Sequence, residues 1–162
     1  MGMAKAVLIS INKPHTDNIF AGKKGIEWRK KPLPEGLYYV YETKNKGGCG
    51  KVIGEMRIAG SKAVDTNKPL QVSLVNAGCV HPVTLKKYAN NGVIYANFIK
   101  CAKLYGEPIE LSEFWSADKC PYTSKGCCTY EYHCFRAGQM KRCGSTLQRP
   151  PQSWCYVEER NE

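Results

Sequence analysis

The sequence has no long run of apolar residues. The apolar run at residues 6–9 is ended by Ser10, and no run approaches the roughly 18 residues of a membrane helix. The N-terminus also lacks the pattern of a signal peptide. Gly2 does not begin a myristoylation motif, because that motif needs Ser or Thr where Ala6 stands. We therefore expect a soluble, cytoplasmic protein that does not enter a membrane.

Acidic residues are scarce. The chain has 14 Asp and Glu against 24 Lys and Arg, which gives a formal net charge of +10. A chain this basic favours an acidic partner, for which nucleic acid is the commonest candidate, although the same charge also serves solubility. The length of 162 residues predicts a single domain, residues 1–162, with a hydrophobic core of its own.

Internal repeats and low-complexity tracts are absent, so the fold must be built from short, unlike elements. Alternating or β-branched runs predict strands, and two segments bounded by proline, glycine or Asn-Gly suit short helices. The predicted strands cover residues 5–11, 25–29, 37–42, 51–59, 93–104 and 153–158, the predicted helices cover 15–21 and 84–90, and residues 61–78 remain unassigned. This set of elements predicts an α+β protein with short helices, built as a small mixed β-barrel or a curled sheet.

One motif carries most of the functional information. Gly22, Lys24, Glu27 and Arg29 form the pattern G-x-K-x-x-E-x-R where a short helix leads into a strand. Glu27 and Arg29 are two residues apart, so on a strand they share a face. Taken alone, such neighbours could be a simple surface ion pair of small energetic weight, about 0–1 kcal/mol.

The motif resembles the signature of the ASCH domain, a branch of the PUA-like superfamily. Further segments resemble that family in the same order: residues 39–42, 52–55, 95–103 and 108–114. The resemblance implies a PUA-like mixed β-barrel and a cleft that binds RNA or a modified nucleobase. It makes the motif residues the candidate site, with no cofactor needed by the barrel itself.

The residue types in the motif suit recognition of a nucleotide. Arg29 can offer a donor fork to a phosphate or a guanine edge, Glu27 can accept from an exocyclic amine, and Lys24 can act as a mobile charge. Lysines and aromatic residues interleave around the motif, as in sites that stack single-stranded RNA bases and follow the backbone. The candidate nucleic-acid-binding residues are Lys13, Lys24, Glu27, Arg29, Lys30 and Tyr41.

An enzyme is the alternative. The resemblance includes small hydrolases that deacylate acetylated cytidine or cleave single-stranded RNA, in which case Lys24 and Glu27 would be catalytic. The deacylating branch is implied to use a threonine nucleophile three residues after the lysine, and here that position holds Glu27. A carboxylate can act as a base but not as a hydroxyl nucleophile. Cleavage of RNA by Glu27 with Lys24 or His15 stays open, and we expect a binding module rather than an enzyme.

Cysteine is abundant and unevenly placed. The chain has 9 cysteines, an odd number that excludes complete internal pairing. Residues 118–146 form a cysteine-rich insertion before the last strand, in which a zinc site, free thiols and disulfides all remain open. The segment could also dock a protein partner. The candidate zinc ligands are Cys120, Cys128, Cys134 and Cys143, with Cys127 and His133 as alternates.

Overall fold

The computed structural model describes residues 4–117 and 146–161. Its strands are β1 (Lys5–Ile11), β2 (Ile26–Arg29), β3 (Gly36–Glu42), β4 (Lys51–Asp65), β5 (Val93–Ile109) and β6 (Trp154–Glu158), and its α-helices are α1 (His15–Phe20), α2 (Val72–Gly78) and α3 (Pro82–Tyr88). Short 3-10 turns cover η1 (Asn45–Gly47) and η2 (Leu111–Glu113). The predicted α+β class with short helices is confirmed.

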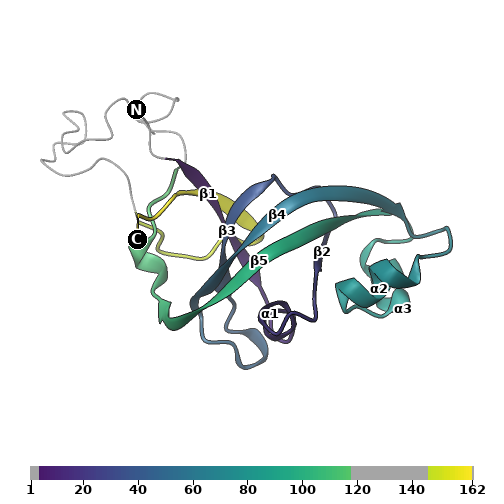
Figure 1. Ribbon diagram of the computed structural model, residues 1–162, viewed down its shortest axis with the longest axis horizontal. Coiled ribbons are helices and arrows are strands. Elements are labelled where there is room, and N and C mark those ends of the chain that lie inside the picture. Colours follow the sequence, from purple (N-terminus) through teal and green to yellow (C-terminus); the bar gives the residue numbers. More distant parts are fainter. Residues whose placement is uncertain (1–3, 118–145, 162) are drawn as a thin grey trace, which may run out of the picture.

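The six strands form one sheet in the order β2-β5-β4-β3-β1-β6. β1 and β3 are parallel, and the other neighbours are antiparallel. Of the two predicted forms, the small mixed β-barrel is not closed: among the described strands, β2 and β6 are the two edges of the sheet and do not pair with each other. β4 and β5 are long and strongly bent by register shifts, which curl the sheet without closing it (Figure 1).

Both faces of the sheet are covered in its middle, which explains why β1 is apolar along nearly its whole length. Val7, Ile9 and Ile11 face the cluster that contains Ile19 of α1. Ala6 and Leu8 face a second cluster built on β3, η2 and β6. A strand buried on both faces loses the polar alternation that would otherwise mark it in the sequence.

The helices α2 and α3 lie together at one end of the β4–β5 pair (Figure 1). They cover a third cluster, in which Leu85 of α3 packs with Ile26, Trp28, Ile94 and Ala96 of β2 and β5. This packing places the helices beside β2, the strand that carries the motif. No helix in the described part of the chain is long and apolar enough to cross a membrane.

Candidate functional site

The motif lies on β2, an edge strand whose backbone is bonded to the buried side-chain amide of Asn97. Asn97 of β5 lies opposite Glu27 in the ladder and is fully buried. Its Nδ2 donates to the Glu27 carbonyl over 3.0 Å, and its Oδ1 accepts from the Leu33 amide over 2.8 Å. β2 has only four residues. The bond to the Glu27 carbonyl therefore helps to hold the backbone of the motif, and the bond to Leu33 holds the segment that follows β2.

Lys24, Glu27 and Arg29 form one buried charged group, here called the charged triad. Arg29 Nε donates to Glu27 Oε1 over 3.0 Å, and Lys24 Nζ lies 3.7 Å from Glu27 Oε2. Their side chains are 1% (Lys24), 9% (Glu27) and 17% (Arg29) exposed. The carboxylate therefore has a cation at each oxygen, and two positive charges meet one negative charge.

Neutral groups complete the coordination of the two cations. Lys24 Nζ donates to the carbonyl of Gly78, the last residue of α2, over 2.6 Å. Arg29 Nη2 donates to the Ser10 carbonyl over 2.9 Å, and Arg29 Nη1 donates to Ser153 Oγ over 3.0 Å. Arg29 thus links edge strand β2 to β1 and to the segment before β6, across the opening of the sheet. Three of its five N–H groups are engaged, which leaves two.

Burial changes the titration of two groups at this site. Burial lowers the pKa of the Lys24 ammonium, and the nearby Glu27 carboxylate acts in the opposite direction. Burial also lowers the pKa of His15, and the positive charge of Lys24 adds to that effect. Nδ1 of His15 is buried and has no hydrogen-bond partner in the described part of the chain. His15 is therefore a neutral imidazole near pH 7.

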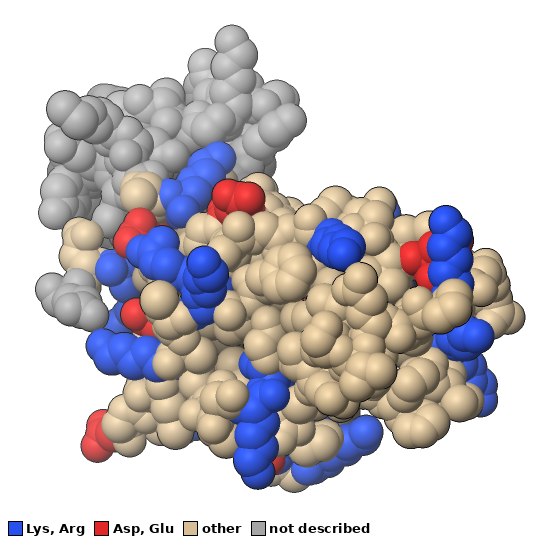
Figure 2. All heavy atoms as spheres, turned by 45° about the vertical axis from the view of Figure 1, so that its right-hand side comes forward, with Lys and Arg blue, Asp and Glu red and all other residues tan. Residues whose placement is uncertain are grey.

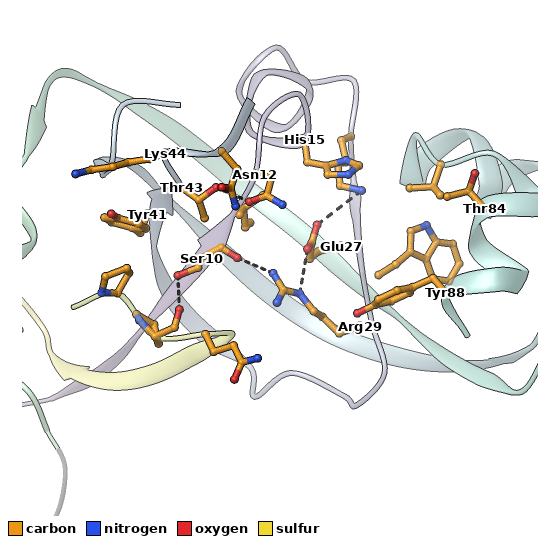
Figure 3. Close-up of a pocket in the computed structure, with 18 of the residues that line it drawn as sticks. Ser10, Asn12, His15, Glu27, Arg29, Tyr41, Thr43, Lys44, Thr84 and Tyr88 are labelled. Atoms are coloured by element: carbon orange, nitrogen blue, oxygen red, sulfur yellow. Dashed lines mark hydrogen bonds and ion pairs between the residues drawn. The ribbon is translucent and has the colours of Figure 1, made fainter. Parts of the chain in front are cut away.

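The charged triad lies in the floor of a cavity of about 710 Å³, a size typical of small-molecule sites. Figure 3 shows Glu27 and Arg29 in the middle, with Thr43 and Lys44 toward one end and Tyr88 and Thr84 of α3 toward the other. The cavity therefore runs between the end of β3 and helix α3.

The six candidate nucleic-acid-binding residues divide into two sets. Lys24, Glu27, Arg29 and Tyr41 line the cavity. Lys13 does not line it and pairs with Asp17 at 2.6 Å. Lys30 also lies outside the lining and sits over the Tyr88 ring, with Nζ 5.2 Å from its centroid.

Sequence reasoning missed part of the lining. Asn12, Thr43 and the α3 residues Thr84 and Tyr88 line the cavity, although no spacing in the sequence connects them with the motif. Gly78 was missed as well, because it contributes a backbone carbonyl and not a side chain. Lys44 also lines the cavity, and its one sequence signal is its place among several lysines that follow β3.

The cysteine predictions cannot be placed in the fold. All six candidate zinc ligands lie outside the described residues, so a zinc site at 118–146 stays a prediction. Among the described residues, no group of three or more His, Cys, Asp or Glu could hold a metal ion. Cys49, Cys79 and Cys101 are free thiols.

Comparison with known proteins identifies the architecture. The crystal structure of an ASCH protein from Zymomonas mobilis superposes with a TM-score of 0.61 and 17% sequence identity, covering 95% of this chain and 88% of that chain. Two single-residue variants of that protein superpose equally well, with 17% and 18% identity and at least 95% of this chain covered. The chain has the ASCH fold. No family model and no curated protein matches the sequence, so it is the three-dimensional structure that supports this comparison.

Proposed function

We propose that this ASCH-fold protein binds single-stranded RNA or a modified nucleobase in the cavity around the charged triad. The observation that carries the proposal is the triad itself: two cations and one carboxylate, all mostly buried, in the floor of a cavity. Burying charges is costly, so a protein that needed only stability could replace them with apolar side chains. Charges kept at the bottom of a cavity are typical of ligand recognition.

The chemistry around the charged triad suits a nucleotide. Arg29 keeps two N–H groups for an acceptor on the ligand. Tyr88 lines the cavity with a side chain that is 43% exposed and offers a ring for a base to contact. On the face that Figure 2 shows, Lys and Arg are distributed and not gathered in one patch. Nonspecific attraction would come from this whole surface, and selectivity from the cavity.

The proposal is tested by equilibrium binding of fluorescently labelled single-stranded RNA. We expect Arg29→Ala to weaken binding by about tenfold or more, since it removes a charge-assisted donor. Lys62→Ala, which removes one exposed positive charge on β4 outside the cavity, should change affinity far less. Log affinity should fall with log salt by about 0.7 for each neutralised phosphate. Equal affinities for Arg29→Ala and Lys62→Ala, or no binding at low salt, would contradict the proposal.

A hydrolase remains the second candidate, because burial lowers the pKa of Lys24 beside the Glu27 carboxylate and the neutral His15 lines the same cavity. A lysine, a carboxylate and an imidazole in one cavity are the groups of general acid–base catalysis. This candidate predicts turnover of single-stranded RNA or of an acylated nucleoside that is lost in Glu27→Gln. Absence of turnover on both substrate classes would exclude it and leave the binding proposal in place.

A further inference from the structure

The two sides of the cavity differ in chemistry. Toward the end of β1 and the loop after β3 the lining is polar, with Asn12, Thr43 and Lys44. Toward α3 it is aromatic and aliphatic, with Tyr88 and Leu85 as examples. Figure 3 shows Glu27 and Arg29 between these two sides, with Asn12 and Thr43 on one flank and Tyr88 on the other. A ligand that fills the cavity must therefore carry a polar part and a planar or apolar part.

In the described part of the chain, the polar side of the cavity presents an unpaired hydrogen-bond donor. Thr43 Oγ1 donates to Asn12 Oδ1, so the remaining hydrogen-bonding group of Asn12 is its amide nitrogen. That nitrogen has no partner among the described residues, and Figure 3 shows it directed away from Thr43. The Ser10 carbonyl accepts from Arg29, and the Ser10 hydroxyl donates to the Pro151 carbonyl over 2.7 Å. Arg29 therefore engages the Ser10 carbonyl, and the Ser10 hydroxyl proton is used by Pro151.

The donors of Asn12 and Arg29 lie in the same part of the cavity, near Ser10. Ser10 of β1 and Asn12, which directly follows the strand, both line the cavity. Arg29 reaches the Ser10 carbonyl and keeps one unpaired N–H on each terminal nitrogen. The amide of Asn12 and the guanidinium of Arg29 therefore face one region of the cavity. An acceptor with several oxygen atoms could bond to both.

The net charge of the cavity lining is positive, which suits an anionic acceptor as the donors do. Among the described lining residues, Lys24, Arg29 and Lys44 are cations and Glu27 is the single carboxylate, a net charge of +2. Glu42 lies outside the lining, where it accepts from Thr16 Oγ1 over 2.6 Å and from the Cys49 amide over 3.0 Å. The lining carries excess positive charge that an anionic ligand would neutralise.

From these observations we infer that the cavity recognises a phosphate together with a base, so that it binds nucleotides in preference to nucleosides. The phosphate accepts from Asn12 and Arg29, Lys44 adds a positive charge at that end, and the base contacts Tyr88. The inference rests on the proposed nucleotide-binding function and specifies its ligand class. A free mononucleotide and an RNA strand share this chemistry, and the experiment below separates them.

The test is calorimetric titration of the intact protein with matched ligands: each nucleoside, its monophosphate, and a single-stranded tetranucleotide. We expect the monophosphate to bind at least about tenfold more tightly than its nucleoside, because its oxygens form charge-assisted hydrogen bonds. Asn12→Ala should reduce this ratio most and Lys44→Ala by less, whereas Lys62→Ala should preserve it. Tyr88→Ala should weaken nucleoside and nucleotide binding by the same factor. Tighter binding of the tetranucleotide than of any monophosphate identifies a strand as the ligand.

A second measurement uses the unmodified protein, so it does not depend on how a variant folds. Inorganic phosphate should compete with the monophosphate more strongly than chloride does at equal ionic strength, and should leave nucleoside binding unchanged. Equal affinity for nucleoside and monophosphate would overturn the inference while leaving the proposed function intact. A ratio that persists in the Asn12→Ala/Lys44→Ala double variant would also overturn it. Failure of every ligand to bind would overturn the proposed function as well.

Discussion

This molecule has ion pairs of two kinds, one buried beneath a cavity and the other exposed to water. The charged triad joins Glu27 to Arg29 at 3.0 Å and to Lys24 at 3.7 Å, with all three side chains mostly buried. Lys13–Asp17 is shorter, at 2.6 Å, yet its side chains are 33% and 54% exposed. The shorter pair is the weaker support for the fold, because water screens an exposed pair and each partner can be hydrated when the other is removed. For these ion pairs, burial matters more than the N–O distance for the contribution to stability.

The comparison also shows why the charged triad needs its neutral partners. A buried cation must replace the hydrogen bonds it made with water, and the carbonyls of Gly78 and Ser10 do this for Lys24 and Arg29. The exposed pair has no such requirement. The triad is thus bonded to α2 and β1, so a shift of either element changes the cavity. Lys13, by contrast, precedes α1 and pairs with Asp17 in the first turn of that helix, only four residues away in the sequence.

The largest expected effect is that of removing the shared carboxylate. Glu27→Ala leaves Lys24 and Arg29 close together without a counter-charge, and we expect it to lower the free energy of unfolding by about 3 kcal/mol. Arg29 is 17% exposed and can turn toward water, which limits the loss. Urea denaturation measures the effect.

The matched control is Asp17→Ala, which breaks the exposed pair with Lys13. We expect its urea midpoint to equal that of the unmodified protein within experimental error. If the two variants lost the same free energy of unfolding, the distinction between the buried and the exposed pair would be wrong.

A smaller effect is expected at the glycine that supplies the acceptor for Lys24. A Cβ added at Gly78 would lie 1.9 Å from Trp28 Nε1 and 2.8 Å from its Cε2. Gly78→Ala must therefore push α2 away from β2, and overpacking of this kind costs about 1–3 kcal/mol. The same shift would move the Gly78 carbonyl from Lys24. Thermal unfolding, with ligand affinity measured in parallel, checks both consequences.

Gly106→Ala is the matched control for that substitution. A Cβ at Gly106, on the exposed part of β5, would meet nothing within 4 Å. We expect its unfolding free energy to stay within about 0.5 kcal/mol of the unmodified value. Equal effects of the two substitutions would show that α2 does not pack tightly on Trp28.

Local sequence patterns were enough to predict most of the fold. The alternation around Ile26 and Trp28 predicted β2, and the aromatic run of residues 37–42 predicted β3, each within one residue of its observed bounds. Helix α2 was missed because its sequence has a weak apolar pattern and no capping side chain, and Val72 is 71% exposed. The lengths of β4 and β5 were underestimated, because both strands continue through polar, exposed residues on bulged backbone.

The candidate site was predictable only where its residues are close in sequence. The spacing of Glu27 and Arg29 placed them on one face of a strand, and the structure has them in contact. Gly78, Asn12 and Tyr88 come from other parts of the chain, and only packing brings them to the same cavity. The openness of the sheet was not predictable either, because strand number does not determine whether two edges meet.

The smallest expected effect is on the pH dependence of stability. It concerns His15, the neutral neighbour of the charged triad. Burial, reinforced by Lys24, lowers the pKa of His15 below its usual value of 6.5, and Lys46 and Arg29 act in the same direction against Glu27. The unfolded chain therefore takes up this proton at a higher pH than the folded chain does. As pH falls below about 6.5, the unfolded state gains protons first and stability declines.

His15→Gln removes this titration, so its unfolding free energy should fall less between pH 7 and pH 5 than that of the unmodified protein. The carboxylates titrate in both proteins, and the difference between the two pH profiles isolates His15. Urea denaturation at half-unit pH steps provides the profiles. Parallel profiles would mean that the His15 proton is equally well accommodated in the folded chain, beside Lys24, and in water. The positive charge of Lys24 would then have no net effect on the protonation of His15, the first residue of α1. The excess positive charge of the cavity would not be felt at that helix.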